Sequence, residues 1–79
     1  MINDEREFLE WLAKAKHGDR EIYHRGLLMD DRRSSVTGKP VLPLDKLATL
    51  VMKSSDRGEV HLFQKRTPKG GCEYMVERR

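Results

Sequence analysis

The side chains with catalytic or metal-binding potential are scattered along this chain of 79 residues. Asp30 and Asp31 are adjacent carboxylates, a pair that serves acid–base catalysis or holds a divalent cation when a pocket brings the two together. Neighbouring residues on a helix point about 100° apart, and Arg32 and Arg33 follow directly. We therefore interpret this run as a solvated charged turn.

The histidines and the single cysteine lack the spacing of a metal or nucleophile site. His17, His24 and His61 lie in different segments, and no second cysteine accompanies Cys72. The hairpin register given below places Cys72 and His61 on opposite faces, which separates a cysteine nucleophile from its base. No phosphate-binding glycine loop, serine-nucleophile elbow or dinucleotide fingerprint is present. We predict a non-enzymatic protein without a metal or cofactor.

The composition favours a small binding domain with a charged surface. Apolar residues and charged residues each make up 37% of the chain, and at this length only about 60% of the unfolded chain's surface can be buried. We therefore expect one domain over residues 1–79, with no room for a deep catalytic pocket. A single cysteine excludes an internal disulfide and favours a reducing, cytoplasmic setting. The acidic N-terminus and the lack of a long apolar run argue against secretion and against membrane insertion.

The excess positive charge lies in the C-terminal half of the chain. Residues 1–40 hold eight basic and eight acidic side chains, whereas residues 41–79 hold eight basic and five acidic ones, which gives the net charge of +3. A local basic surface is therefore expected there, and such a surface suits an acidic partner such as nucleic acid.

Hydrophobic periodicity predicts two main helices, over residues 4–17 and 44–57. Asn3 and Asp4 can cap the first helix, and Gly18 follows it. Gly58 follows the second helix. Between them we predict a short strand over 21–24, about two helical turns within 27–35, and a loop over 35–43. The core side chains expected from the two periodic segments are Phe8, Leu12, Ala15, Leu44, Leu47, Ala48 and Val51.

The last segment, GEVHLFQKRTPKGGCEYMVERR, is predicted to form a hairpin. A five-residue loop over 67–71 sets a register in which opposed side chains suit each other, and a slip by one residue would destroy that match. Apolar residues then face apolar residues, and Lys65 faces a glutamate. The expected pairs are Arg66 with Cys72, Lys65 with Glu73, Gln64 with Tyr74, Phe63 with Met75, Leu62 with Val76, and His61 with Glu77.

Two sets of residues are candidates for binding. Cations at the hairpin tip, beside Gly70 and Gly71, can approach a phosphate backbone closely, and polar groups at helical spacing line one side of the 44–57 helix. If Leu62 and Val76 face the core, the opposite face of the hairpin exposes an apolar pair that suits a protein partner or a homodimer. The nucleic-acid set is Lys46, Thr49, Lys53, Lys65, Arg66 and Lys69, and the protein-contact set is Tyr23, Arg25, Phe63 and Met75.

The order of the predicted elements is that of a winged helix, in which the third helix enters the major groove and the hairpin is the wing. The fold class expected is α+β, with about three helices, a C-terminal β-hairpin and a short third strand. The runs YHRGLLMDDR, GEVHLFQKR and GCEYMVERR also resemble small phage- or prophage-encoded proteins. This resemblance implies a short binding protein that acts on DNA or on host machinery, in the host cytoplasm.

Two features depart from a DNA-binding winged helix. About nine residues separate the predicted second and third helices, where a helix-turn-helix uses three or four, and Asp45 would repel phosphates. Two hypotheses therefore stand. The first is a regulatory protein that binds double-stranded DNA through the third helix and the hairpin tip. The second is a phage-type protein that binds a host protein complex, such as defence or transcription machinery, and inhibits or redirects it.

Overall fold

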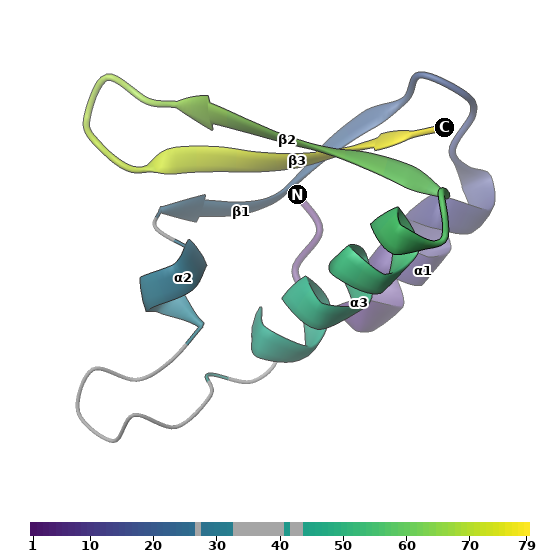
Figure 1. Cartoon of the computed structure of the whole chain (residues 1–79), viewed down its shortest axis with the longest axis horizontal. Coiled ribbons are helices and arrows are strands. Elements are labelled where there is room, and N and C mark those ends of the chain that lie inside the picture. Colours follow the sequence, from purple (N-terminus) through teal and green to yellow (C-terminus); the bar gives the residue numbers. More distant parts are fainter. Residues whose placement is uncertain (27, 33–40, 42–43) are drawn as a thin grey trace.

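The computed structural model of the chain describes residues 1–26, 28–32, 41 and 44–79. Helices α1 and α3 lie on one side of a three-stranded antiparallel sheet whose strand order is β1-β3-β2 (Figure 1). The α+β class predicted from the sequence is confirmed. The elements are α1 (Glu5–Lys14), β1 (Arg20–Gly26), α2 (Leu28–Asp31), α3 (Leu44–Asp56), β2 (Val60–Arg66) and β3 (Cys72–Arg78).

Helix α1 begins where the sequence predicts and ends three residues early. The Asp4 side chain accepts a hydrogen bond from the Glu7 backbone N–H at 2.8 Å, which caps the first turn. At the other end Ala15 is extended, and the Lys16 N–H donates to the Asp19 carboxylate at 2.8 Å. A local side chain thus takes a backbone N–H that would otherwise continue the helix.

Helix α2 is a single turn, so the prediction of two helical turns is wrong for the residues that the structure describes. The turn spans four residues, and the Leu28 N–H at its start donates to the Tyr74 hydroxyl at 3.2 Å. A helix this short has no stability of its own and depends on such contacts with the sheet. Most of the predicted 35–43 loop lies outside the described residues.

The predicted hairpin register is confirmed in every pair. Phe63 lies opposite Met75, Leu62 opposite Val76, and Arg66 opposite Cys72. Strand β1 is longer than predicted and pairs with the other edge of β3, with an irregularity between Ile22 and His24. Tyr23 has no partner in this register, which is the mark of a β-bulge.

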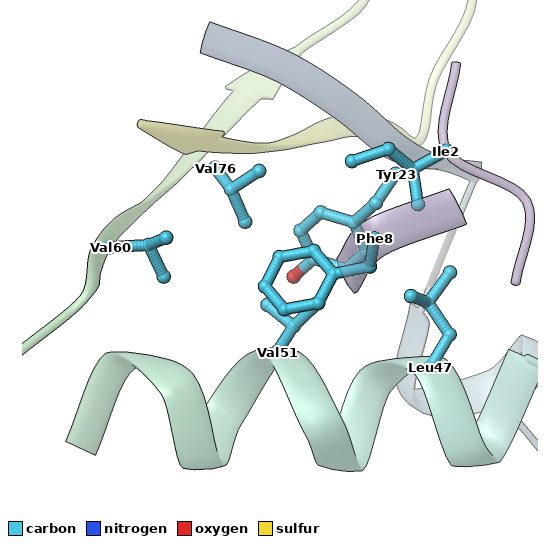
Figure 2. Packing of buried hydrophobic residues seen from close by; sticks show 7 residues of the cluster. All are labelled: Ile2, Phe8, Tyr23, Leu47, Val51, Val60 and Val76. Atoms are coloured by element: carbon cyan, nitrogen blue, oxygen red, sulfur yellow. The ribbon is translucent and has the colours of Figure 1, made fainter. Parts of the chain in front are cut away.

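The core forms between the two long helices and one face of the sheet (Figure 2). Phe8 of α1 and Val51 of α3 are fully buried and meet Val60 and Val76 of the sheet. Each such side chain contributes about 1.5–3 kcal/mol by leaving water. Strand residues alternate between faces, so the face that carries Phe63 and Met75 is the one without helices. The buried cluster is Ile2, Phe8, Tyr23, Leu47, Val51, Val60 and Val76.

A polar network fixes the turn from α3 into β2. Ser54, which is fully buried, donates to a Glu59 carboxylate oxygen at 2.8 Å, and Arg57 donates to the same oxygen at 3.0 Å. The bond from Ser54, followed by that from Arg57, lowers the pKa of Glu59. Gly58 supplies the positive φ of +79° that the reversal requires. The start of β2 is thereby held at a set angle to the helix.

Gly26 is the glycine whose replacement we expect to cost the most. Its φ is +124°, and a Cβ there would lie 2.5 Å from an oxygen of Asp31. That oxygen bonds His24 Nε2 at 2.8 Å, so a Cβ at Gly26 would force the Asp31 carboxylate to shift and would disturb this bond. Gly26→Ala should lower the free energy of unfolding by roughly 2–4 kcal/mol, from backbone strain and the clash together.

Gly18→Ala is the matched control. Gly18 also has a positive φ, of +92°, but a Cβ there meets no atom within 4 Å. Only the strain of about 1–2 kcal/mol should remain. Urea unfolding followed by circular dichroism measures both values, and equal losses would contradict the role assigned to Asp31.

Candidate functional site

The hairpin tip consists of the end of β2, which carries Lys65 and Arg66, and a closed loop over residues 67–71, which carries Lys69. The Thr67 N–H donates to the Gly71 carbonyl at 3.2 Å, and the Gly70 N–H donates to the Thr67 carbonyl at 3.2 Å. Gly70 and Gly71 have φ values of +88° and +76°, which side chains rarely adopt. Thr67 Oγ1 closes the loop further by donating to the Gly70 carbonyl. The glycines thus fold the loop tightly and leave Lys69 at its surface.

The three predicted tip cations are exposed and without ion pairs. Lys65, Arg66 and Lys69 each lie at the surface, and none is within ion-pair distance of an acid in the described part of the chain. Lys65 lies opposite Glu73, but the Glu73 carboxylate accepts from Arg25 Nε at 3.0 Å instead. The tip therefore carries three positive charges that no neighbouring acid neutralises.

The predicted nucleic-acid contacts on α3 are less suited to phosphate binding than those at the hairpin tip. Lys46 and Lys53 are exposed on α3, but the Thr49 hydroxyl between them donates to the Asp45 carbonyl at 2.9 Å and accepts from Arg32 at 3.1 Å. Thr49 is half-buried and its hydroxyl is held within the fold, so its predicted contact with nucleic acid stays a prediction. A hollow of about 300 Å³ at this surface is lined by two acids as well as the lysines: Glu5, Asp45, Lys46, Thr49, Leu50 and Lys53.

The contact between Arg32 and α3 was not predicted from the sequence. Its guanidinium pairs with Asp45 at 3.0 Å and also bonds Thr49, which ties α3 to the residue that follows α2. No periodicity links residues so far apart in the chain, so the sequence holds no signal for this contact. The pair offsets part of the negative charge of Asp45 that the sequence set against phosphate binding.

The tip and the α3 lysines do not form one cluster. Figure 1 shows the β2–β3 loop at the far end of the sheet, beyond both long helices, with the first turn of α3 well away from it. The molecule is elongated, with principal extents of 39 × 27 × 20 Å. A ligand that contacts both sets must be extended, as a nucleic-acid duplex is.

The helix-free face of the sheet carries an apolar row. Ile22, Met75 and Phe63 lie side by side across the three strands, and Phe63 is 38% exposed. The Arg20 guanidinium lies 4.8 Å from the centre of the Phe63 ring, a cation–π contact. Ile22 is a member that sequence reasoning missed, because the register of β1 depends on its bulge. We call Ile22, Met75 and Phe63 the apolar row.

Ion pairs flank the apolar row on both sides. Arg20 pairs with Glu77 at 2.6 Å, and Arg25 pairs with Glu73 at 3.0 Å. Arg25 is exposed, so it remains reachable by a partner at the edge of this face. The face as a whole has an apolar centre and a charged rim, which is the usual layout of a protein contact.

Tyr23 does not belong to this surface, which corrects the prediction that it contacts a partner. The bulge turns its side chain into the core, where it is 6% exposed, beside Tyr74 at a ring-centre distance of 6.2 Å. Burial, helped by Tyr74, raises the pKa of Tyr23 to about 12. The sequence predicts a short strand that contains Tyr23 and ends before Gly26. It holds no signal for the bulge, which depends on pairing with β3.

A second hollow lies on the helix side of the hairpin. It has a volume of about 410 Å³ and a mainly apolar lining that includes Leu62, Met52 and Tyr74. Leu62 is 40% exposed. The sequence analysis allowed for a core-facing Leu62, and in the structure this side chain is only partly covered.

Three of the reactive side chains considered above, Cys72, His24 and Asp31, are engaged in the fold. Cys72 is buried and lies 3.1 Å from the Gln64 amide, and Asp31 pairs with His24. No group of three histidine, cysteine, aspartate or glutamate side chains that suits a metal occurs among the residues described. Within the same residues, no helix has the length and apolar character needed to cross a membrane.

Comparison with protein-family models, curated proteins and solved structures finds no match for this chain.

Burial of the Tyr23 hydroxyl predicts a loss of stability at high pH. Its pKa is raised from 10 to about 12, so the stabilisation is complete below pH 10 and is lost as pH rises through 12. At pH 11 the wild type should have lost about 1 kcal/mol from this group. Tyr23→Phe should lack this loss, and Tyr74→Phe should keep it, in urea unfolding at pH 8 and pH 11. An equal loss in all three proteins would contradict the assignment.

Proposed function

We propose that the protein is a small, non-enzymatic, cytoplasmic regulator that binds double-stranded DNA through its hairpin tip. The observation that carries this proposal is a set of three exposed cations that pair with no acid in the described part of the chain: Lys65 and Arg66 at the end of β2, and Lys69 on the closed loop that follows. Phosphate contacts need exposed cations near backbone that approaches closely, and the glycines of the tip permit that approach.

The arrangement supports a winged-helix-like mode of docking. Strand order β1-β3-β2, two helices on one face and a C-terminal hairpin are compatible with a wing formed by β2 and β3. The single turn of α2 and the acids beside α3 set this chain apart from a helix-turn-helix reader. We therefore assign the main contact to the wing and a secondary phosphate contact to Lys46 and Lys53.

Such a contact is electrostatic, so its affinity depends on salt. Each phosphate neutralised by a cation releases condensed counterions, and the slope of log affinity against log salt is about −0.9 for each contact. Cations that touch phosphate rather than base edges carry no sequence preference. Binding should therefore weaken steeply with salt and differ little between sequences.

Replacement of the tip cations is the direct test. The triple variant Lys65→Gln, Arg66→Gln, Lys69→Gln should reduce the magnitude of the salt slope by about 2–3 and weaken binding to any duplex. Fluorescence anisotropy with duplexes of two unrelated sequences, at several salt concentrations, measures both effects.

A charge-matched variant controls for net charge. Arg6, Lys14 and Lys16 are exposed cations near helix α1, and their replacement by glutamine removes the same charge far from the tip. This variant should keep most of the salt slope. Undetectable duplex binding by the wild type, or equal effects of both triple variants, would refute the tip assignment.

A second candidate function is contact with a host protein through the apolar row, as an inhibitor or adaptor of phage type. The observation that favours it is the layout of the helix-free face, with Phe63 and Met75 at its centre and Arg20 and Arg25 at its rim. Aromatic and arginine side chains dominate the binding energy of protein interfaces.

Phe63→Ala distinguishes this candidate from DNA binding. If the apolar row is the contact, capture of a host protein from nuclease-treated lysate should fall at least about fivefold, while the triple tip variant captures normally. Leu9→Ala removes a 51% exposed apolar side chain from α1 and should have no effect. Capture that depends on nucleic acid, or that survives Phe63→Ala, would exclude the apolar row as the contact.

A further inference from the structure

Strand β2 lies at the edge of the sheet and pairs with β3 without a bulge. It spans seven residues, it occupies the outer position in the sheet order, and no strand in the described part of the chain pairs with its free side. The opposite edge, β1, is interrupted by its bulge and partly covered, since the Ile2 N–H donates to the Ile22 carbonyl at 2.8 Å. An open edge with unpaired N–H and C=O groups is a template for another strand.

The bonds at the two ends of the hairpin show which groups of β2 point outward. The Arg79 N–H donates to the Glu59 carbonyl at 3.1 Å, and the Thr67 N–H donates to the Gly71 carbonyl at 3.2 Å. Antiparallel partners alternate between bonded and non-bonded pairs. The odd-numbered residues of β2 therefore bond to β3, and the outward N–H and C=O groups belong to Val60, Leu62, Gln64 and Arg66.

We infer that β2 pairs with β2 of a second copy of this chain, around a two-fold axis at Phe63. Antiparallel pairing about this axis sets Leu62 opposite Gln64 of the second copy, so the outward groups bond to one another. Phe63 then meets its own copy at a non-bonded position, where side chains approach most closely. The result is a continuous six-stranded sheet.

With this register, the apolar row of one copy lies in line with the apolar row of the other. The apolar row of Ile22, Met75 and Phe63 becomes one uninterrupted row across both sheets. Lys65 lies opposite His61 of the second copy, so no like-charged pair is formed by lysine or arginine. Axes at Leu62 or at Gln64 would instead oppose Phe63 with His61 or with Lys65. This self-match is why we assign the edge to a second copy rather than to an unrelated strand.

The dimer should be weak and reversible. One strand pair makes a small interface, and interfaces well below about 1,200 Å² are typical of transient complexes. Lys65 and Arg66 near the end of β2 also oppose indiscriminate edge pairing. The inference does not depend on the proposed DNA contact and is tested on purified protein alone.

Gln64→Pro tests the edge without disturbing the hairpin. The Gln64 N–H points to the open side, so proline removes an outward donor but no bond to β3, and proline is tolerated at strand edges. Gln64→Ala loses the same side-chain contact with Cys72 and keeps the N–H. In sedimentation velocity from about 10 µM to 1 mM, wild type and Gln64→Ala should shift toward twice the mass of 9.2 kDa, and Gln64→Pro should stay at that mass.

Cross-linking checks the position of the axis. Phe63→Cys places a thiol at the axis, and a short bifunctional maleimide should join two copies far more efficiently than in Leu9→Cys, whose site is exposed on α1. Wild type, whose Cys72 is buried, is the background control. Far-UV circular dichroism verifies that each variant is folded. A wild type that is monomeric at every concentration, a Gln64→Pro dimer, or equal cross-linking at both sites would overturn the inference.

Discussion

The alternation of side chains along the hairpin is the constraint on which the rest of the structure depends. Even-numbered residues such as Val60 and Val76 face helices α1 and α3 and are fully buried, whereas Phe63 and Met75 point to the face without helices. Because the strand period is two, one register decides both the core and the outer surface. The apolar row, its flanking ion pairs and the outward groups of β2 all follow from that one choice.

The two ends of the hairpin are held by different means. At the end near the helices, the Ser54–Glu59 hydrogen bond and Gly58 fix the entry into β2. At the tip, two glycines with positive φ and the bonds of Thr67 close the loop. Little apolar burial supports the tip, so its order rests on short-range hydrogen bonds and backbone conformation. Its charges can therefore lie far from the core without weakening it.

The two proposed binding surfaces use different physics. The tip carries solvent-exposed positive charges, whose attraction for an acidic partner is long-ranged but screened by salt. The helix-free face offers apolar area surrounded by paired charges, where binding comes from the removal of water. A strand added at β2 would extend the second surface and leave Lys69 exposed, but it would also pair the stretch that carries Lys65 and Arg66, so the two surfaces meet at the end of β2.

The sequence by itself determined the α+β class, the extent of the two long helices to within a few residues, the hairpin register and the exposed cations at the tip. These features arise from local periodicity, capping and turn chemistry, which neighbouring residues encode. Only the tertiary structure decided that α2 is a single turn, that Arg32 engages Thr49 and Asp45, and that a bulge buries Tyr23 and places Ile22 beside Met75. Each of these depends on contacts between residues distant in the chain, whose geometry no local pattern specifies.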